Sequence, residues 1–157
     1  MSSTTGKNIK LTLFGESHGD MIGITIDGLK PGIELDMDYI NNEIEKRKAY
    51  GAISTPRHES DQVEIVSGYF NGYTTGTPLT IIVRNENKKS SDYKPNILRP
   101  SHADYTAFLK YNGYQDYRGG GHFSGRVTVG IVAVGAICKQ ILEKKGILIG
   151  SHIKQIH

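Results

Sequence analysis

The sequence of 157 residues has no tryptophan, only one cysteine and no run of 18 apolar residues. Without such a run, no membrane-spanning helix is expected. A single cysteine, Cys138, excludes an internal disulfide framework and a cysteine-based zinc site. The N-terminal stretch MSSTTGKNIK also lacks the basic region and apolar core of a secretory signal. We therefore expect a cytoplasmic protein that has no membrane partner.

A large excess of charge is absent as well, because 19 basic and 16 acidic residues give a formal net charge of +3. This charge is too small to indicate nucleic-acid binding. The single RGG in YRGGGH (117–122) is neither repetitive nor part of a disordered segment, so an RNA-binding module is disfavoured. A small basic excess does suit a protein that binds small anions, and the length allows one domain with a hydrophobic core.

Residue patterns predict an α/β fold in which helices and sheet form layers. Alternating or β-branched runs predict strands at 9–14, 21–28, 62–70 and 78–84, the last buried on both faces. The stretch 36–49 is typical of an amphipathic helix that begins at the capping residue Asp36. A second helix is expected at 101–113, with Ser101 as its cap, Phe108 and Leu109 on its apolar face, and Gly113 at its end.

The stretch 123–146 allows two interpretations. Its β-branched content favours a strand, whereas its length favours a buried helix, which we predict. The apolar face would then contain Val127, Ile131, Val134, Cys138 and Ile141, and Gly130 and Gly135 would allow close packing. A further strand is expected at 147–150, and because the sequence stops soon after it, we expect the chain to be part of a longer protein.

Two Ser-His pairs are the first candidates for chemistry: Ser17-His18 in FGESHGD (14–20) and Ser101-His102 in RPSHADYTAF (99–108). Imidazole titrates near neutral pH and can therefore donate or accept a proton. A lone histidine is more often structural, so a catalytic role is a hypothesis at this point. A zinc site is a competing interpretation, but its candidate ligands match no spacing of a known zinc motif: Glu16, His18, His102 and Asp104.

A third candidate is the glycine-rich turn YRGGGHFSGR (117–126), which has Arg118 and Arg126 on either side. Clustered glycine marks positive φ or close approach of a ligand, and backbone N–H groups before a helix can bind phosphate. A tight turn alone would explain the glycines equally well. Further positive charge comes from Arg47, Arg57 and Arg99. The residues alone thus indicate a protein that binds a polyanionic small molecule and moves protons.

The blocks FGESHG, VEIVSG, TTGTPL, RPSHADYT and DYRGGGHFSGR stand in the order and spacing of the N-terminal portion of the chorismate synthase family, which the sequence resembles from about Gly6 onward. The resemblance implies a β-α-β sandwich-like fold, of which residues 1–157 would be the N-terminal part of one catalytic domain. It also implies a lyase of the shikimate pathway of aromatic amino acid biosynthesis. This enzyme would form chorismate by anti 1,4-elimination of phosphate from 5-enolpyruvylshikimate 3-phosphate.

The family further implies reduced FMN (FMNH2) as cofactor, NADPH as reductant in bifunctional members, and a homotetramer at full length. By motif, His18 would donate a proton near the substrate phosphate, and His102 would lie beside the flavin. Cofactor-binding positions would be His122, Phe123, Ser124 and Arg47, and substrate-binding positions would be Ser17, Arg47, Arg118 and Arg126. No metal is implied.

The sequence departs from the family pattern at three points. KRKAYG (46–51) replaces the usual Arg-Arg-Arg-Pro-Gly, so that Ala52 falls near the place of a second NADP-associated arginine. His122-Phe123 replaces Arg-Ser at the flavin site. Members are also considerably longer, and an expected catalytic aspartate lies in the part beyond this sequence. The alternative function is therefore a catalytically incomplete fragment that only binds anions or flavin.

Overall fold

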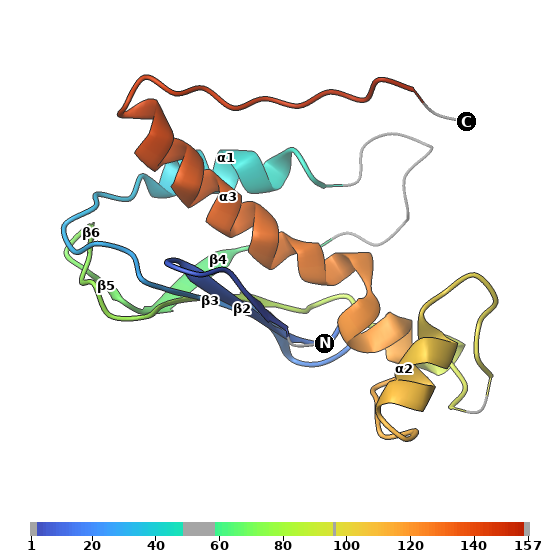
Figure 1. The fold of residues 1–157 in the computed structure, drawn as a ribbon. Coiled ribbons are helices and arrows are strands. Elements are labelled where there is room, and N and C mark those ends of the chain that lie inside the picture. The colour runs from blue at the N-terminus through green and yellow to red at the C-terminus, as the bar shows by residue number, and fades with distance from the viewer. Residues whose placement is uncertain (1–2, 49–58, 96, 156–157) are drawn as a thin grey trace.

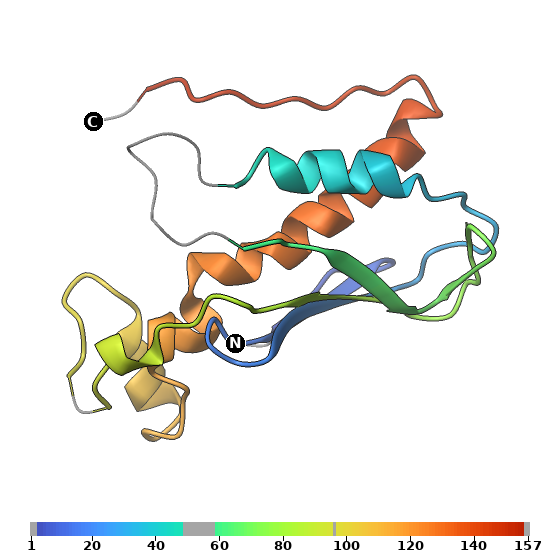
Figure 2. The same ribbon diagram turned by 180° about the vertical axis from the view of Figure 1, so that it is seen from behind.

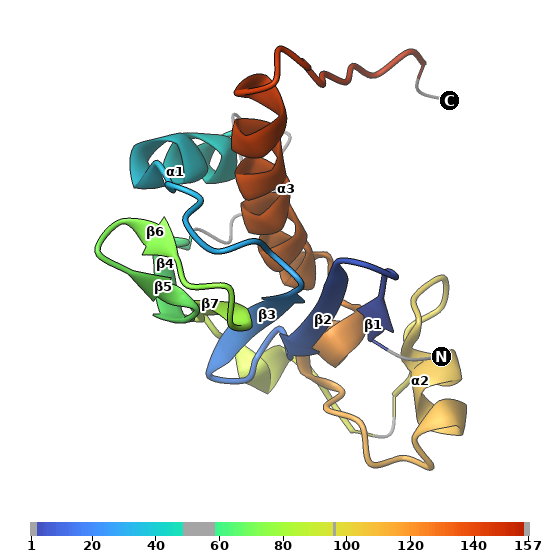
Figure 3. The same cartoon turned by 60° about the vertical axis from the view of Figure 1, so that its left-hand side comes forward.

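The computed structural model describes residues 3–48, 59–95 and 97–155. Its main feature is an antiparallel sheet in the order β1-β2-β3-β7-β4 (Figure 3). The strands are β1 (Thr4–Thr5), β2 (Lys10–Gly15), β3 (Met21–Asp27), β7 (Leu79–Arg84) and β4 (Val63–Ser67). The strands predicted at 9–14, 21–28 and 78–84 are confirmed, and four of the six residues of β7 are buried.

The single strand predicted at 62–70 is two strands. The register of β4 against β7 shifts between Ile65 and Ser67, and the chain then enters a separate hairpin of β5 (Tyr69–Phe70) and β6 (Tyr73–Thr74). Asn71 and Gly72 form its turn with positive φ values of 47° and 89°, as a two-residue hairpin of this twist requires. A bulge and a left-handed turn thus end the strand early.

Two helices, α1 (Met37–Glu45) and α3 (Thr128–Glu143), cover one face of the sheet (Figure 1). Alternate residues of β3 and β7 point toward these helices and form the core with them. The Asp36 carboxylate accepts a hydrogen bond of 3.0 Å from the Tyr39 amide, which confirms the predicted cap of α1. The observed architecture is therefore the predicted layered α/β fold, in which a layer of helices packs on the five-stranded sheet.

The helix predicted at 123–146 is confirmed as α3. Of its predicted apolar face, Val127 and Val134 are buried and Cys138 and Ile141 pack against the core, but the placement of Ile131 there is wrong. Ile131 is 51% exposed, whereas Val129, Ala133 and Ile137 are fully buried. Gly130 does allow close packing, since a Cβ there would lie 3.2 Å from the Cβ of Ile24, whereas Gly135 faces open space. Most residues of this helix are apolar, so the position of the sheet decides which of them are most deeply buried.

Length and apolar composition alone would allow the stretch Gly125–Glu143 to cross a membrane, and half of it is buried inside the fold. Its buried residues contact the sheet and α1, and this packing explains its apolar composition. Helices in the cores of proteins pass the same test, so the stretch is weak evidence for a span.

The predicted helix at 101–113 is shorter, spanning α2 (Asp104–Lys110). The expected cap is wrong, because Ser101 has a φ of 61° and Ala103 precedes the helix without a side-chain hydrogen bond. The expected apolar face is also wrong: Phe108 and Leu109 are exposed, and α2 buries Asp104 and Ala107 instead. The Gly113 amide does close the helix end, donating to the Phe108 carbonyl.

Three 3₁₀ turns complete the described elements: η1 (Ser90–Asp92), η2 (Arg118–Phe123) and η3 (Gly125–Val127). After α3 the chain runs back on the side of the helix layer that faces away from the sheet (Figures 1 and 2). The strand predicted at 147–150 is not formed, and Ile147, Leu148 and Ile149 are exposed. A strand needs a hydrogen-bonded neighbour, and the described residues supply none for this segment.

Candidate active site

The predicted site residues converge at one end of the sheet. The turn between β2 and β3 meets η2 there, and the Ser17 amide donates a 3.0 Å hydrogen bond to the Gly121 carbonyl. The chain leaving β7 runs beside the same turn, because the Asn85 amide donates to the Asp20 carbonyl at 3.0 Å. Segments that are far apart in the sequence therefore meet around residues 16–20 (Figure 2).

His18 is buried in this turn, with 5% of its surface exposed. Its Nδ1 is hydrogen-bonded to the Ser90 hydroxyl at 3.0 Å. The edge of the Tyr93 ring packs against the imidazole with a centroid separation of 5.1 Å. Ser90 and Tyr93 belong to the polar segment that follows β7, and these two side chains form one wall around His18.

His102 is held by a carboxylate and a guanidinium. Its Nδ1 donates a 2.6 Å hydrogen bond to Asp104 Oδ1, and Arg99 Nη2 lies 3.3 Å from Nε2. Arg99 Nε also donates to Asp104 Oδ2 at 2.8 Å. Hydrogen bonds from Arg99 hold the pKa of the Asp104 carboxyl well below its usual range, against the opposing effect of burial. The ionised carboxylate fixes the orientation of the imidazole and places the ring proton on Nδ1.

The glycine-rich turn brings the two histidines together. Gly119 and Gly120 both have positive φ, at 60° and 84°. A Cβ on Gly119 would lie 2.4 Å from Cδ2 of His18, and a Cβ on Gly120 would lie 2.4 Å from Cε1 of His102. Because the Cα atoms of adjacent residues are ~3.8 Å apart, these contacts place the two imidazoles within about 12 Å of each other. The close approach of each imidazole to the backbone of this turn thus explains the glycines at these two positions.

Those predicted anion-binding arginines that the structure describes are each bonded to a carboxylate. Arg118 makes two hydrogen bonds with Asp116, of 2.9 and 2.8 Å. Burial raises the pKa of the Asp116 carboxyl, but the hydrogen bonds from Arg118 outweigh it, so that the pKa lies below its ordinary value. Arg47 and Arg126 both pair with Asp61. Arg57 and Ala52, also named above, lie outside the described residues.

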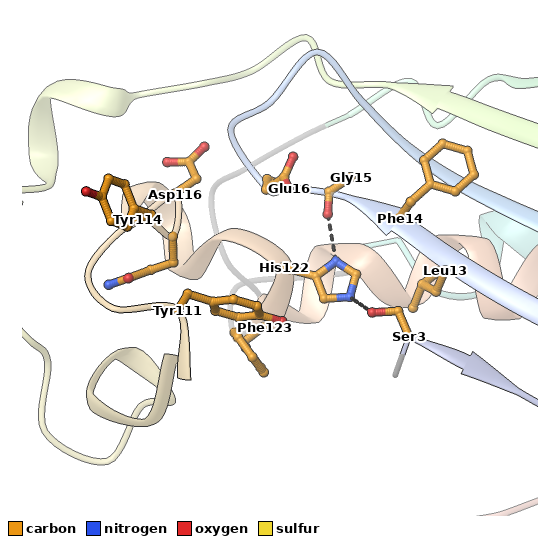
Figure 4. Close-up of a pocket in the computed structure, with 11 residues that line it drawn as sticks. Ser3, Leu13, Phe14, Gly15, Glu16, Tyr111, Tyr114, Asp116, His122 and Phe123 are labelled. Atoms are coloured by element: carbon orange, nitrogen blue, oxygen red, sulfur yellow. Dashed lines mark hydrogen bonds between the residues drawn. The ribbon is translucent and has the colours of Figure 1, made fainter. Parts of the chain in front are cut away.

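Two of the four predicted cofactor-binding residues line a separate pocket of about 530 Å³ (Figure 4). His122 and Phe123 line it, and His122 donates from Nδ1 to the Gly15 carbonyl at 2.9 Å. The rings of Phe123 and Tyr111 lie 6.2 Å apart at its wall. Ser124 is not among the lining residues; its hydroxyl instead accepts a 3.3 Å hydrogen bond from the Arg126 amide.

One lining residue of this pocket, Gln115, has a buried side-chain oxygen that has no hydrogen-bond partner among the described atoms. Two carboxylates, Glu16 and Asp116, also line the pocket, and the Asp116 carboxylate is paired with Arg118. In the described portion of the chain, no group of three or more His, Cys, Asp and Glu side chains is placed to hold a metal ion. The candidate zinc ligands therefore do not form such a group.

Comparison with known proteins identifies the family. The sequence model described as chorismate synthase matches residues 9–157. This chain belongs to the chorismate synthase family. The chorismate synthase of Thermococcus gammatolerans is 53% identical over 153 residues, which cover 96% of this chain and 43% of that relative. The chorismate synthase of Azobacteroides pseudotrichonymphae is 51% identical, with 98% and 44% covered.

A crystal structure of chorismate synthase superposes with a TM-score of 0.64 at 30% identity and covers 90% of this chain and 36% of that one. The resemblance drawn from the sequence blocks and the layered α/β fold are both confirmed. The chain spans less than half the length of these two relatives from Thermococcus gammatolerans and Azobacteroides pseudotrichonymphae.

Three residues that contact the site were missed as functional candidates in the sequence: Asn85, Asp61 and Ser90. Asn85 and Asp61 are buried polar residues, and their burial, which only the structure shows, marks them as candidates. Their partners are 41 and 65 residues away in the sequence. No local pattern connects residues across such separations, so single-sequence reasoning had no means of pairing them.

Proposed function

We propose that this chain carries the proton-handling part of a chorismate synthase active site, which forms chorismate by anti 1,4-elimination of phosphate from 5-enolpyruvylshikimate 3-phosphate. The observation that carries the proposal is the packing of His18 and His102 against the consecutive glycines Gly119 and Gly120. Two imidazoles packed against one glycine turn suit a reaction in which a phosphate and a hydrogen leave the same substrate.

In this proposal His18 donates a proton to the departing phosphate, whose negative charge would otherwise make it a poor leaving group. Its burial and its hydrogen bond to Ser90 fix the direction of the ring. Ser17, which is 1% exposed, lies beside it, since its hydroxyl oxygen would be 2.9 Å from a Cβ on Gly119. His102, oriented by Asp104, handles a second proton of the reaction.

The residues around the 530 Å³ pocket fit the ring system of reduced FMN. The volume falls within the range of about 300–1,000 Å³ typical of small-molecule sites. Phe123 and Tyr111 offer aromatic surface, and the unpaired oxygen of Gln115 offers an acceptor for a ring N–H. When bound, reduced flavin supplies electron density to the substrate.

The finer expectations from the family belong to the same proposal. They are NADPH as the reductant, with Arg47 among its contacts, a homotetrameric assembly and a cytoplasmic location. Arg47, Arg118 and Arg126 raise the local positive charge, but each is bonded to a carboxylate. We therefore assign them to shaping the site around the anionic substrate, in addition to any direct contact.

The test is an anaerobic assay with chemically reduced FMN and 5-enolpyruvylshikimate 3-phosphate that follows phosphate release and chorismate absorbance together. Coupled appearance of both products supports the proposal, and His102→Ala is then expected to lower turnover by about 10²–10⁴-fold. Equilibrium binding of FMN and substrate is measured in parallel. Binding without turnover would favour the fragment alternative, and a folded chain that binds neither would refute the assignment.

A further inference from the structure

A buried side chain at the end of β7 fastens the turn that carries His18. Asn85 is 7% exposed. Its Nδ2 donates to the carbonyls of Glu16 and Gly19, at 3.0 and 2.9 Å, and its backbone amide donates to the Asp20 carbonyl at 3.0 Å. The two side-chain bonds thus fix the carbonyls on either side of the Ser17-His18 pair.

Asn85 is itself held in place by a buried guanidinium. Its Oδ1 accepts a 3.0 Å hydrogen bond from Arg126 Nε, and Arg126 is 8% exposed. Arg126 also donates to the Arg84 carbonyl at 3.3 Å and pairs with Asp61, which is 4% exposed. Asp61 accepts a further hydrogen bond of 2.6 Å from Arg47, just after α1. The contacts form an unbroken series from the end of α1 to the His18 turn.

We propose that Asn85 is a positioning residue for His18, and that Arg126 and Asp61 act through it. This inference rests on the proposed function, in which His18 donates the proton. Misplacing a reacting group by 1 Å can cost about 10²-fold in rate, so the turn needs supports that are themselves rigid. Arg126 and Arg47 thereby act on the substrate indirectly, through the position of His18, because their guanidinium groups are bonded to Asp61.

The chemistry of the side chain restricts what can replace asparagine here. Two N–H donors face two carbonyls while one oxygen faces a guanidinium, so position 85 needs donors and an acceptor together. Aspartate keeps the acceptor for Arg126 but offers no donor to Glu16 and Gly19. Asn85→Asp therefore removes the bonds to the turn and leaves the ion-pair series intact.

A second buried amide in the same chain provides a matched control. Gln140 is also 7% exposed, and its side chain also bonds backbone groups, accepting from the Asp36 amide at 2.9 Å and donating to the Asp36 carbonyl at 3.1 Å. It lies near the C-terminal end of α3, far along the helix from Arg126. Gln140→Ala therefore measures what losing a buried amide costs in general.

The experiment records the imidazole resonances of His18 and His102 by NMR, together with the thermal unfolding midpoint. The resonances are assigned from His18→Ala and His102→Ala. Asn85→Ala and Gln140→Ala are expected to lower the midpoint by similar amounts. Only Asn85→Ala and Asn85→Asp are expected to shift or broaden the His18 signals, whereas His102, held by Arg99 and Asp104, serves as the unchanged internal reference.

Unchanged His18 signals in a folded Asn85→Asp or Asn85→Ala protein would overturn the inference, as would equal changes in Gln140→Ala. If the alanine variant does not fold, the aspartate variant decides the question. Where the wild-type chain turns over, Asn85→Asp is also expected to lower kcat by about 10²-fold with little change in KM. The NMR result does not depend on turnover, so failure of the proposed function and failure of this inference are distinguishable.

Discussion

Substitution of Gly119 by alanine tests the claim that the glycine turn exists to admit the imidazole of His18. The new Cβ would lie 2.4 Å from Cδ2 and 2.6 Å from Nε2 of His18. Non-bonded carbon atoms pack at about 3.5–4.0 Å, so the ring would have to withdraw by about 1 Å. We expect turnover to fall by about 10²-fold, because a displacement of this size misplaces the reacting group.

The expected loss of stability has two parts. A left-handed backbone at Gly119, where φ is 60°, costs an alanine about 1–2 kcal/mol. Overpacking against a buried side chain adds about 1–3 kcal/mol. The total of about 2–5 kcal/mol is below the stability of most single domains, about 5–15 kcal/mol, so the variant can be studied while folded.

Gly32→Ala separates the two parts. Gly32 has a φ of 77°, and no atom lies within 4 Å of a Cβ built there, so this variant carries the backbone cost alone. Urea denaturation of both variants gives the difference in unfolding free energy, and the His18 NMR signals report the displacement of the ring. Equal losses of stability, with His18 signals unchanged in Gly119→Ala, would refute the reasoning.

Two further predictions concern acid stability and the packing of α3. The pKa of Asp104 is held low by Arg99, so its carboxylate stabilises the fold above pH ~4, and this contribution is lost as the pH falls below that value. Asp104→Asn should therefore lower the unfolding free energy by about 1–3 kcal/mol at pH 7. It should also flatten the decline of the unfolding free energy that urea denaturation measures from pH 5 to pH 3, and an unaltered decline would contradict the assignment. Gly135→Ala should raise the unfolding free energy by about 1 kcal/mol, since its surroundings are open. Gly130→Ala, with its Cβ at 3.2 Å from Ile24, should lower the unfolding free energy through overpacking. Thermal or urea unfolding of the two variants checks this prediction, and a gain of stability in both would contradict it.

The arrangement of the arginines changes how the positive charge of the site is understood. A basic residue in a motif invites the interpretation that it contacts an anion directly. Arg126 is buried and fully engaged with Asp61, Asn85 and the Arg84 carbonyl. A guanidinium in such surroundings is fixed by several partners at once, which suits it to holding neighbouring groups in place.

Much of the local structure was determined by the sequence itself. The strands β2 and β3, the Asp36 cap of α1 and the helix end at Gly113 all depend on residues a few positions apart. Such features follow from backbone and side-chain geometry within one or two turns. The family was also contained in the sequence, because several blocks in register identify it without any coordinates.

Only the tertiary structure decided which atoms meet in the site. The bonds from Arg126 to Asn85 and from His122 to Gly15 join residues 41 and 107 positions apart. The buried face of α3, the exposure of Phe108 and the contacts of Gly119 with His18 likewise depend on where other elements pack. Periodicity describes one element at a time, whereas a hydrogen bond or a close contact depends on two backbones brought together by the whole fold. The residue types that carry the chemistry could therefore be predicted from the sequence, but their partners could not.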